Sequence, residues 1–62
     1  MPEEFEYWQS SNDSMWYFHL KSPNNEIIAH SEGYATMQNC LDGINAVKNY
    51  APNAAINEKT QE

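Results

Sequence analysis

The first half of the chain has the alternating hydrophobic pattern of β-strands. Residues 15–21 alternate most clearly between apolar and polar side chains, which predicts a half-buried strand. Residues 5–9 are rich in strand-forming aromatic residues and predict a strand before it. Residues 26–32 follow a turn signal of proline and asparagine, so residues 15–32 are predicted to form a β-hairpin.

Two registers are open for this hairpin. A four-residue loop pairs Lys21 with Glu26, whereas a two-residue turn pairs Lys21 with Ile28, and both registers place the same residues on each face. The face predicted to be buried carries Trp16, Phe18, Leu20, Ile27, Ala29 and Ser31. The outer face carries Tyr17, His19, Lys21, Ile28, His30 and Glu32. The pairing of residues 5–9 stays open, and with it whether Tyr7 or Trp8 faces the core.

The spacing of apolar residues changes after Gly33. It becomes i, i+3, i+4, i+7 at Met37, Cys40, Leu41, Ile44 and Val47. This spacing predicts a helix from about residue 37 to residue 50, with Thr36 as N-cap and Pro52 as its stop. Gly43 within the helix indicates either close packing on the sheet or plain tolerance of a glycine. Residues 53–57 predict a short last strand of modest propensity.

The predicted fold class is α+β, with the element order β-β-β-α-β and an antiparallel sheet that carries one helix on one face. We expect a single domain at residues 5–57, between flexible tails at residues 1–4 and 58–62. A three-stranded sheet of this kind has two open edges and a thin core, and both features favour self-association.

Composition indicates that the core is aromatic. Leu, Ile, Val and Phe together number nine of 62 residues, which is below the roughly 20% at which strongly charged chains tend to be disordered. Eight aromatic residues, six of them within the first 18 positions, supply the missing apolar area. A domain of this length buries only about 60% of its unfolded surface, so a second copy is expected to stabilise it.

The charge of the chain restricts its partners and its location. Nine acidic residues stand against three lysines and no arginine, a formal net charge of −6, so neither nucleic acid nor an anionic membrane surface is an expected partner. No apolar run approaches the roughly 20 residues that span a bilayer, and the N-terminus lacks the pattern of a signal peptide. The single cysteine, Cys40, agrees with a reducing compartment. A cytoplasmic location is therefore expected.

Several blocks of the sequence, taken together, resemble the YegP-like family of small bacterial domains of unknown function. The blocks are WYFHLK at residues 16–21, NNEIIA at 24–29, SEGY at 31–34, CLDGI at 40–44 and Val47-Lys48. The resemblance extends over about residues 5–57. It implies a β3-α-β unit that forms a homodimer, in which two units share one sheet and exchange C-terminal strands at roughly residues 53–57. The family supplies no catalytic residues.

Two groups of residues are candidate sites for chemistry, and each also has a simpler interpretation. His19, His30 and Glu32 on the outer face could share a zinc ion, but a flat strand face supplies no fourth ligand, and ordinary surface histidines are favoured. Cys40 could pair with a histidine as a nucleophile, but its place in the apolar stripe favours a buried thiol. No cofactor, metal or catalytic residue is therefore predicted.

The outer face is the predicted interaction surface, because exposed apolar patches on small domains often mark contacts. Its predicted members are Tyr17, His19, Ile28 and His30. We therefore predict a non-catalytic interaction or structural module with an unidentified protein partner. The alternative is a metal- or thiol-dependent enzyme that uses His19, His30 and Glu32, or Cys40.

Overall fold

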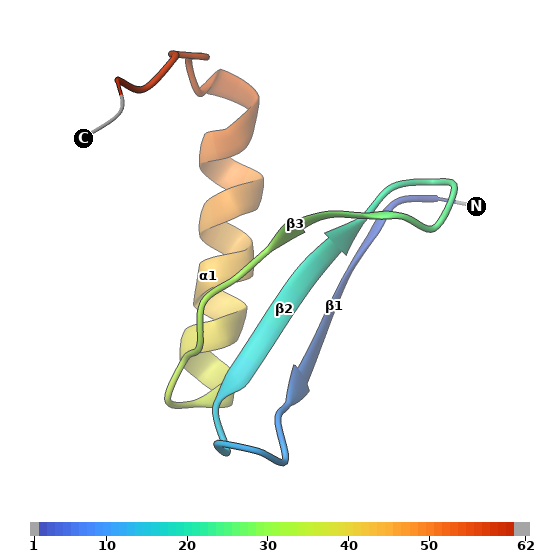
Figure 1. Cartoon of the computed structure of the whole chain (residues 1–62), viewed down its shortest axis with the longest axis vertical. Helices are drawn as coiled ribbons and strands as arrows, with labels where there is room; N and C mark the ends of the chain where they lie inside the picture. Colours follow the sequence, from blue (N-terminus) through green and yellow to red (C-terminus); the bar gives the residue numbers. More distant parts are fainter. Residues whose placement is uncertain (1, 61–62) are drawn as a thin grey trace.

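The computed structural model describes residues 2–60, so residues 1, 61 and 62 of the predicted tails lie outside the described residues. The elements are β1 (Glu4–Gln9), β2 (Trp16–Lys21), β3 (Ile27–His30), α1 (Met37–Tyr50) and a short 3-10 helix, η1 (Ala51–Asn53). The strands form one antiparallel sheet in the order β1-β2-β3, and α1 lies on one face of it (Figure 1). The predicted α+β class, the antiparallel sheet and the single helix are confirmed.

The pairing of β1 with β2 decides which aromatic residue of β1 faces the helix. Tyr7 lies opposite Phe18, and Trp8 lies opposite Tyr17. Because Phe18 is buried against α1, Tyr7 belongs to the inner face and Trp8 to the outer face. Alternation within the strand could not make this choice, since both residues are aromatic.

The β2–β3 hairpin contains a register shift that neither predicted register includes. His19 pairs with His30 and Leu20 with Ala29, as the two-residue turn requires, but the next pair is Lys21 with Ile27. The prediction that Ile27 is buried is wrong, because a shift of one residue exchanges the faces of a strand. Ile27 is 56% exposed. Ala29 keeps its predicted place opposite Leu20, yet it is exposed as well.

The hairpin loop accounts for the pairing of Lys21 with Ile27. Asn25 has a φ of 72°, the left-handed conformation that asparagine tolerates. The Ser22 N–H donates to the Glu26 carbonyl at 2.8 Å, and the Asn25 N–H donates to the Ser22 carbonyl at 2.9 Å. These bonds close a three-residue loop, residues 23–25, which leads directly to the pairing of Lys21 with Ile27. The shift to the pairing of Leu20 with Ala29 then falls at Ile28.

The core is small, and aromatic side chains dominate its sheet side. Phe18, Cys40 and Ile44 are buried, and the half-buried residues packed around them are Phe5, Trp16, Tyr34, Leu41 and Val47. The Phe18 ring stacks on Tyr34 at 6.1 Å and meets Phe5 edge-on at 5.9 Å. These contacts agree with the aromatic core that the composition predicts. Met37, the first member of the predicted apolar stripe, is exposed.

Helix α1 begins and ends as predicted. The Asn39 N–H donates to Thr36 Oγ1 at 3.1 Å, so Thr36 is the N-cap. The helix ends at Tyr50, two residues before Pro52, whose ring cannot continue a helix.

The segment between β3 and α1 returns to β2 and packs a tyrosine under the helix. Trp16 and Tyr34 exchange two backbone hydrogen bonds, both of 2.8 Å. The Tyr34 ring then lies so close to α1 that a Cβ at residue 43 would be 2.5 Å from its Oη and 2.8 Å from its Cζ. Close packing of Tyr34 therefore accounts for Gly43.

Gly43→Ala is expected to destabilise the fold by about 1–3 kcal/mol, the usual cost of overpacking, although alanine is the better helix former by about 0.5–1 kcal/mol. The matched control is Asn45→Ala on the exposed side of α1, which is expected to change stability by only a few tenths of a kcal/mol. Thermal unfolding followed by circular dichroism compares the two variants. Equal stability of both would contradict the requirement for glycine.

The predicted last strand at residues 53–57 is absent from the single chain. Residues 51–53 form η1, and residues 54–60 have no regular secondary structure. Figure 1 shows that this segment runs from the C-terminal end of α1 away from the sheet. Strand pairing needs a neighbouring sheet edge, and this path leads away from both edges. Ile56 in its centre is 100% exposed.

Candidate interaction surface

The sheet face opposite α1, the outer face, collects the predicted interaction residues. Tyr17, His19 and His30 lie on it, and His19 is the direct cross-strand partner of His30. Ile28 lies in the register shift without a partner on β2 and is 61% exposed. The structure therefore groups Tyr17, His19 and His30, and it places Ile28 at their margin.

Trp8 is the centre of this face. Its ring centroid lies 5.0 Å from that of His19, 6.1 Å from that of Tyr17 and 6.2 Å from that of His30. We call these four residues, Trp8, Tyr17, His19 and His30, the aromatic cluster. Trp8 is 37% exposed, so part of its ring is open to a ligand. The sequence patterns did not select Trp8, because only the pairing of β1 with β2 assigns it to the outer face.

One end of the aromatic cluster is held by Asp13, in the loop between β1 and β2. The Tyr17 hydroxyl donates to Asp13 Oδ2 at 2.6 Å, and the Met15 N–H donates to Asp13 Oδ1 at 3.0 Å. The hydrogen bond from Tyr17, followed by that from Met15, lowers the pKa of Asp13. The same contact raises the pKa of Tyr17, because it favours the protonated hydroxyl.

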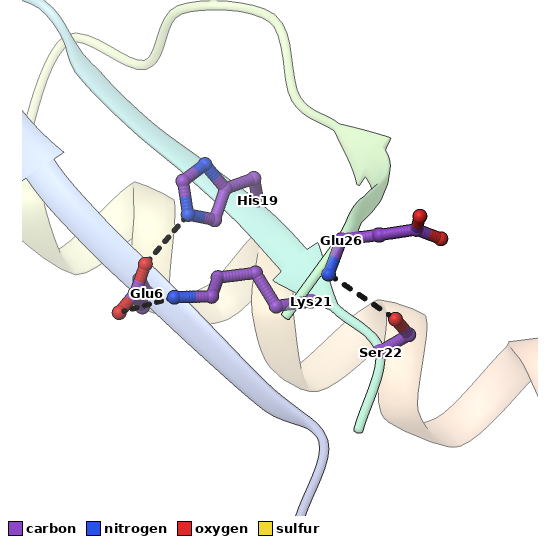
Figure 2. Close-up of polar contacts among 5 residues, drawn as sticks. All are labelled: Glu6, His19, Lys21, Ser22 and Glu26. Atoms are coloured by element: carbon purple, nitrogen blue, oxygen red, sulfur yellow. Dashed lines mark hydrogen bonds and ion pairs between the residues drawn. The ribbon is translucent and has the colours of Figure 1, made fainter. Parts of the chain in front are cut away.

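The other end is held by Glu6 on β1 (Figure 2). His19 Nε2 donates to Glu6 Oε1 at 2.7 Å, and Lys21 Nζ lies 3.4 Å from Glu6 Oε2. The hydrogen bond from His19 is the largest cause of the lowered pKa of Glu6. Figure 2 also shows the Glu26 carboxylate turned away from this group, while the Glu26 N–H donates to Ser22 Oγ at 3.3 Å. Glu6 therefore supplies the carboxylate at this end of the aromatic cluster.

The structure does not form the metal site or the reactive thiol of the alternative interpretation. Among residues 2–60, no three His, Cys, Asp or Glu side chains lie close enough together to hold a metal ion, so His19, His30 and Glu32 do not form such a group. Cys40 is fully buried, and burial raises the pKa of its thiol, whereas a nucleophilic cysteine needs a lowered pKa. The surface formed by the described residues has no pocket.

Comparison with known proteins identifies the family of this chain. The sequence model of the domain of unknown function DUF1508 matches residues 11–58, more than half of the chain. The chain belongs to the DUF1508 family. The resemblance to YegP-like proteins is thereby confirmed. The DUF1508 description assigns no activity, and no helix within residues 2–60 is long and apolar enough to cross a membrane.

Three proteins similar to this chain extend the comparison. A UPF0339 protein of Treponema denticola is 38% identical over 58 residues, which are 94% of this chain and 98% of that protein. The "UPF0339 protein in ptx operon 5'region" of Stutzerimonas stutzeri is 43% identical over 42 residues, which are 68% of this chain and 38% of that protein. The solution structure of a Haloferax volcanii protein, 33% identical, matches with a TM-score of 0.82 and covers 92% of this chain and 95% of that chain. The resemblance implied a bacterial family. Because Haloferax is an archaeon, proteins similar to this chain are not confined to bacteria.

Proposed function

We propose that this chain is a non-catalytic protein-interaction module of the cytoplasm that works as a homodimer. In the proposed dimer, residues 53–57 of each copy add a strand to the sheet of the other. The observation that carries the proposal is the C-terminal segment itself, which leaves the helix and exposes Ile56 completely. The backbone of Ala54 is extended, with φ −75° and ψ 134°, values near those of polyproline II.

The surface area and the radius of gyration of a single copy support the proposed dimer. Its accessible surface is 5163 Å², whereas a compact monomer of this mass would have roughly 4,100 Å². Its radius of gyration is 13.3 Å, against roughly 10.6 Å for a compact chain of this length. The excess area of about 1,000 Å² is similar to the roughly 800 Å² that each partner buries in an interface of standard size.

Exposed apolar side chains on the helix side of the molecule support the same assembly. Tyr7 is exposed on the inner face of β1, and Tyr50 ends the helix. Both β1 and β3 are edge strands whose outer backbone groups are open to a further strand. A second copy could cover these side chains and pair with one of these edges, while the outer face stayed free.

The greater length of one relative is consistent with a fold that is completed by two copies of the β3-α unit. The matched region is only 38% of the Stutzerimonas protein, so that chain has room for a second unit of the same size. A tandem chain could supply from one polypeptide what the proposed homodimer supplies from two.

Light scattering after size exclusion tests the dimer, with an expected mass of twice 7.2 kDa. The exchange is tested by mixing isotope-labelled and unlabelled protein and measuring contacts between copies by NMR. Contacts are expected between Ile56 of one copy and the sheet of the other. A stable folded monomer would refute the dimer, and a dimer in which Ile56 contacts neither sheet would refute the exchange.

The non-catalytic part of the proposal is supported by the chemistry of the candidate residues. The chain has one cysteine, and its thiol is buried with a raised pKa. The outer-face residues His19 and Tyr17 are bound to carboxylates of the same chain. What this face offers a partner is a flat surface of aromatic rings, which suits binding better than proton transfer.

A further inference from the structure

We propose that the aromatic cluster binds arginine side chains on an extended, basic segment of a protein partner. This inference rests on the proposed role of the outer face as an interaction surface, and it names the chemistry of the partner. Its basis is the juxtaposition of partly exposed aromatic rings with carboxylates at both ends of the cluster.

Three polar atoms of the cluster have partners within the chain. The Tyr17 hydroxyl is bound to Asp13, His19 Nε2 is bound to Glu6, and His30 Nδ1 lies 3.0 Å from the Ser31 carbonyl. The Trp8 and Tyr17 rings are nearly parallel, with 24° between their planes. The electron-rich faces of such rings attract cations, and tryptophan does so most strongly.

The charges around the cluster also fit a cation. Asp13 and Glu6 stand at its two ends, and each has a lowered pKa, so both carboxylates are ionised at neutral pH. Lys21 Nζ lies 3.4 Å from Glu6 Oε2, so it balances charge at that end only. A guanidinium group can stack on a ring and donate paired hydrogen bonds to a carboxylate at once, which an ammonium group cannot.

The occupant is a different protein, because this chain lacks the required side chain. It contains no arginine, so a second copy cannot supply the guanidinium group. The described face is flat and has no pocket, which suits an extended segment better than a small molecule. Alternate side chains of an extended segment are about 6.6–6.8 Å apart, close to the 6.1 Å between the Trp8 and Tyr17 rings.

Titration of the whole protein with a ten-residue peptide of alternating arginine and serine tests the inference. The matched peptides replace arginine by lysine or by glutamate. Chemical shifts of the Trp8 indole N–H and of the backbone at Tyr17 and His30 report binding. Saturable shifts are expected with the arginine peptide, binding at least about threefold weaker with the lysine peptide, and none with the glutamate peptide.

Two substitutions locate the site. Trp8→Leu is expected to weaken arginine-peptide binding about tenfold. Asp13→Asn is expected to weaken it about threefold, whereas Asp42→Asn, which removes an equal charge from the exposed side of α1, is expected to weaken it by less than about twofold. If Trp8→Leu does not fold, the comparison of Asp13→Asn with Asp42→Asn is sufficient to test whether the peptide binds at the aromatic cluster.

Equal losses of arginine-peptide affinity for Asp13→Asn and Asp42→Asn would show that net charge alone attracts the peptide. That result would overturn the inference. Unchanged affinity of a folded Trp8→Leu would overturn it as well. Light scattering on the same samples separates the two proposals. A dimeric wild type that does not bind the arginine peptide refutes only the arginine site, whereas a monomeric wild type refutes the proposed assembly.

Discussion

Ile56→Asp is expected to dissociate the proposed dimer and to lower its stability, although Ile56 contacts nothing in a single copy. Its side chain is 100% exposed there, and substitutions at such positions usually change stability by less than about 0.5 kcal/mol. In the exchanged dimer, each Ile56 would be buried against the other copy. Burial of an isoleucine contributes about 1.5–3 kcal/mol, and a buried unpaired aspartate adds a further penalty.

The measurement is light scattering over a range of protein concentrations, together with thermal unfolding. Each dimer carries the substitution twice, so we expect the dissociation constant of the dimer to rise at least about hundredfold. The control is Thr60→Asp, which adds the same charge to an exposed residue beyond the proposed strand. It should leave the mass and the unfolding temperature unchanged. An Ile56→Asp variant that is dimeric and as stable as the wild type would contradict strand exchange.

Phe18→Ala is expected to remove most of the stability of the fold. Phe18 is buried at the centre of the core, where it contacts both Phe5 and Tyr34. Replacement of a buried phenylalanine by alanine costs about 3–5 kcal/mol, because transfer energy is lost and a cavity remains. A domain of this size has only a few kcal/mol of stability from its own core, so the variant should be largely unfolded at room temperature.

Chemical denaturation followed by circular dichroism measures this loss. The graded control is Phe18→Leu, which keeps an apolar side chain at the same position and should cost clearly less than alanine. A second control is His30→Ala, because His30 lies on the outer face away from the core. A Phe18→Ala variant that unfolds at the same denaturant concentration as the His30→Ala variant would show that the core does not depend on this ring.

The elements themselves could be predicted because their signals are local. The two-residue alternation from Trp16 to Lys21 and the helical spacing from Met37 to Val47 each describe one face of one element. The N-cap at Thr36 depends on a residue only three positions away. These features require no knowledge of what the element packs against, and the structure confirms them except at Met37, which is exposed.

The exposure of Ile27 shows where local patterns fail. Its face depends on a loop in which Asn25 adopts a positive φ, and the sequence allowed two other registers. In a strand, one inserted residue reverses every later face, so a small error in a turn becomes a wrong assignment of burial. The missing strand at residues 53–57 is a related case, because a strand exists only where an edge is available to pair with it.

The sequence by itself determined the strands of the hairpin, the helix with its cap, the aromatic character of the core and the grouping of Tyr17, His19 and His30 on one face. Only the tertiary structure decided that Trp8 lies at the centre of that face, that Asp13 and Glu6 stand at its two ends, and that Tyr34 requires a glycine at residue 43. The reason is physical. Periodicity is a property of a single element, whereas register, close approach and hydrogen bonding across strands are properties of pairs of segments that the chain brings together only on folding.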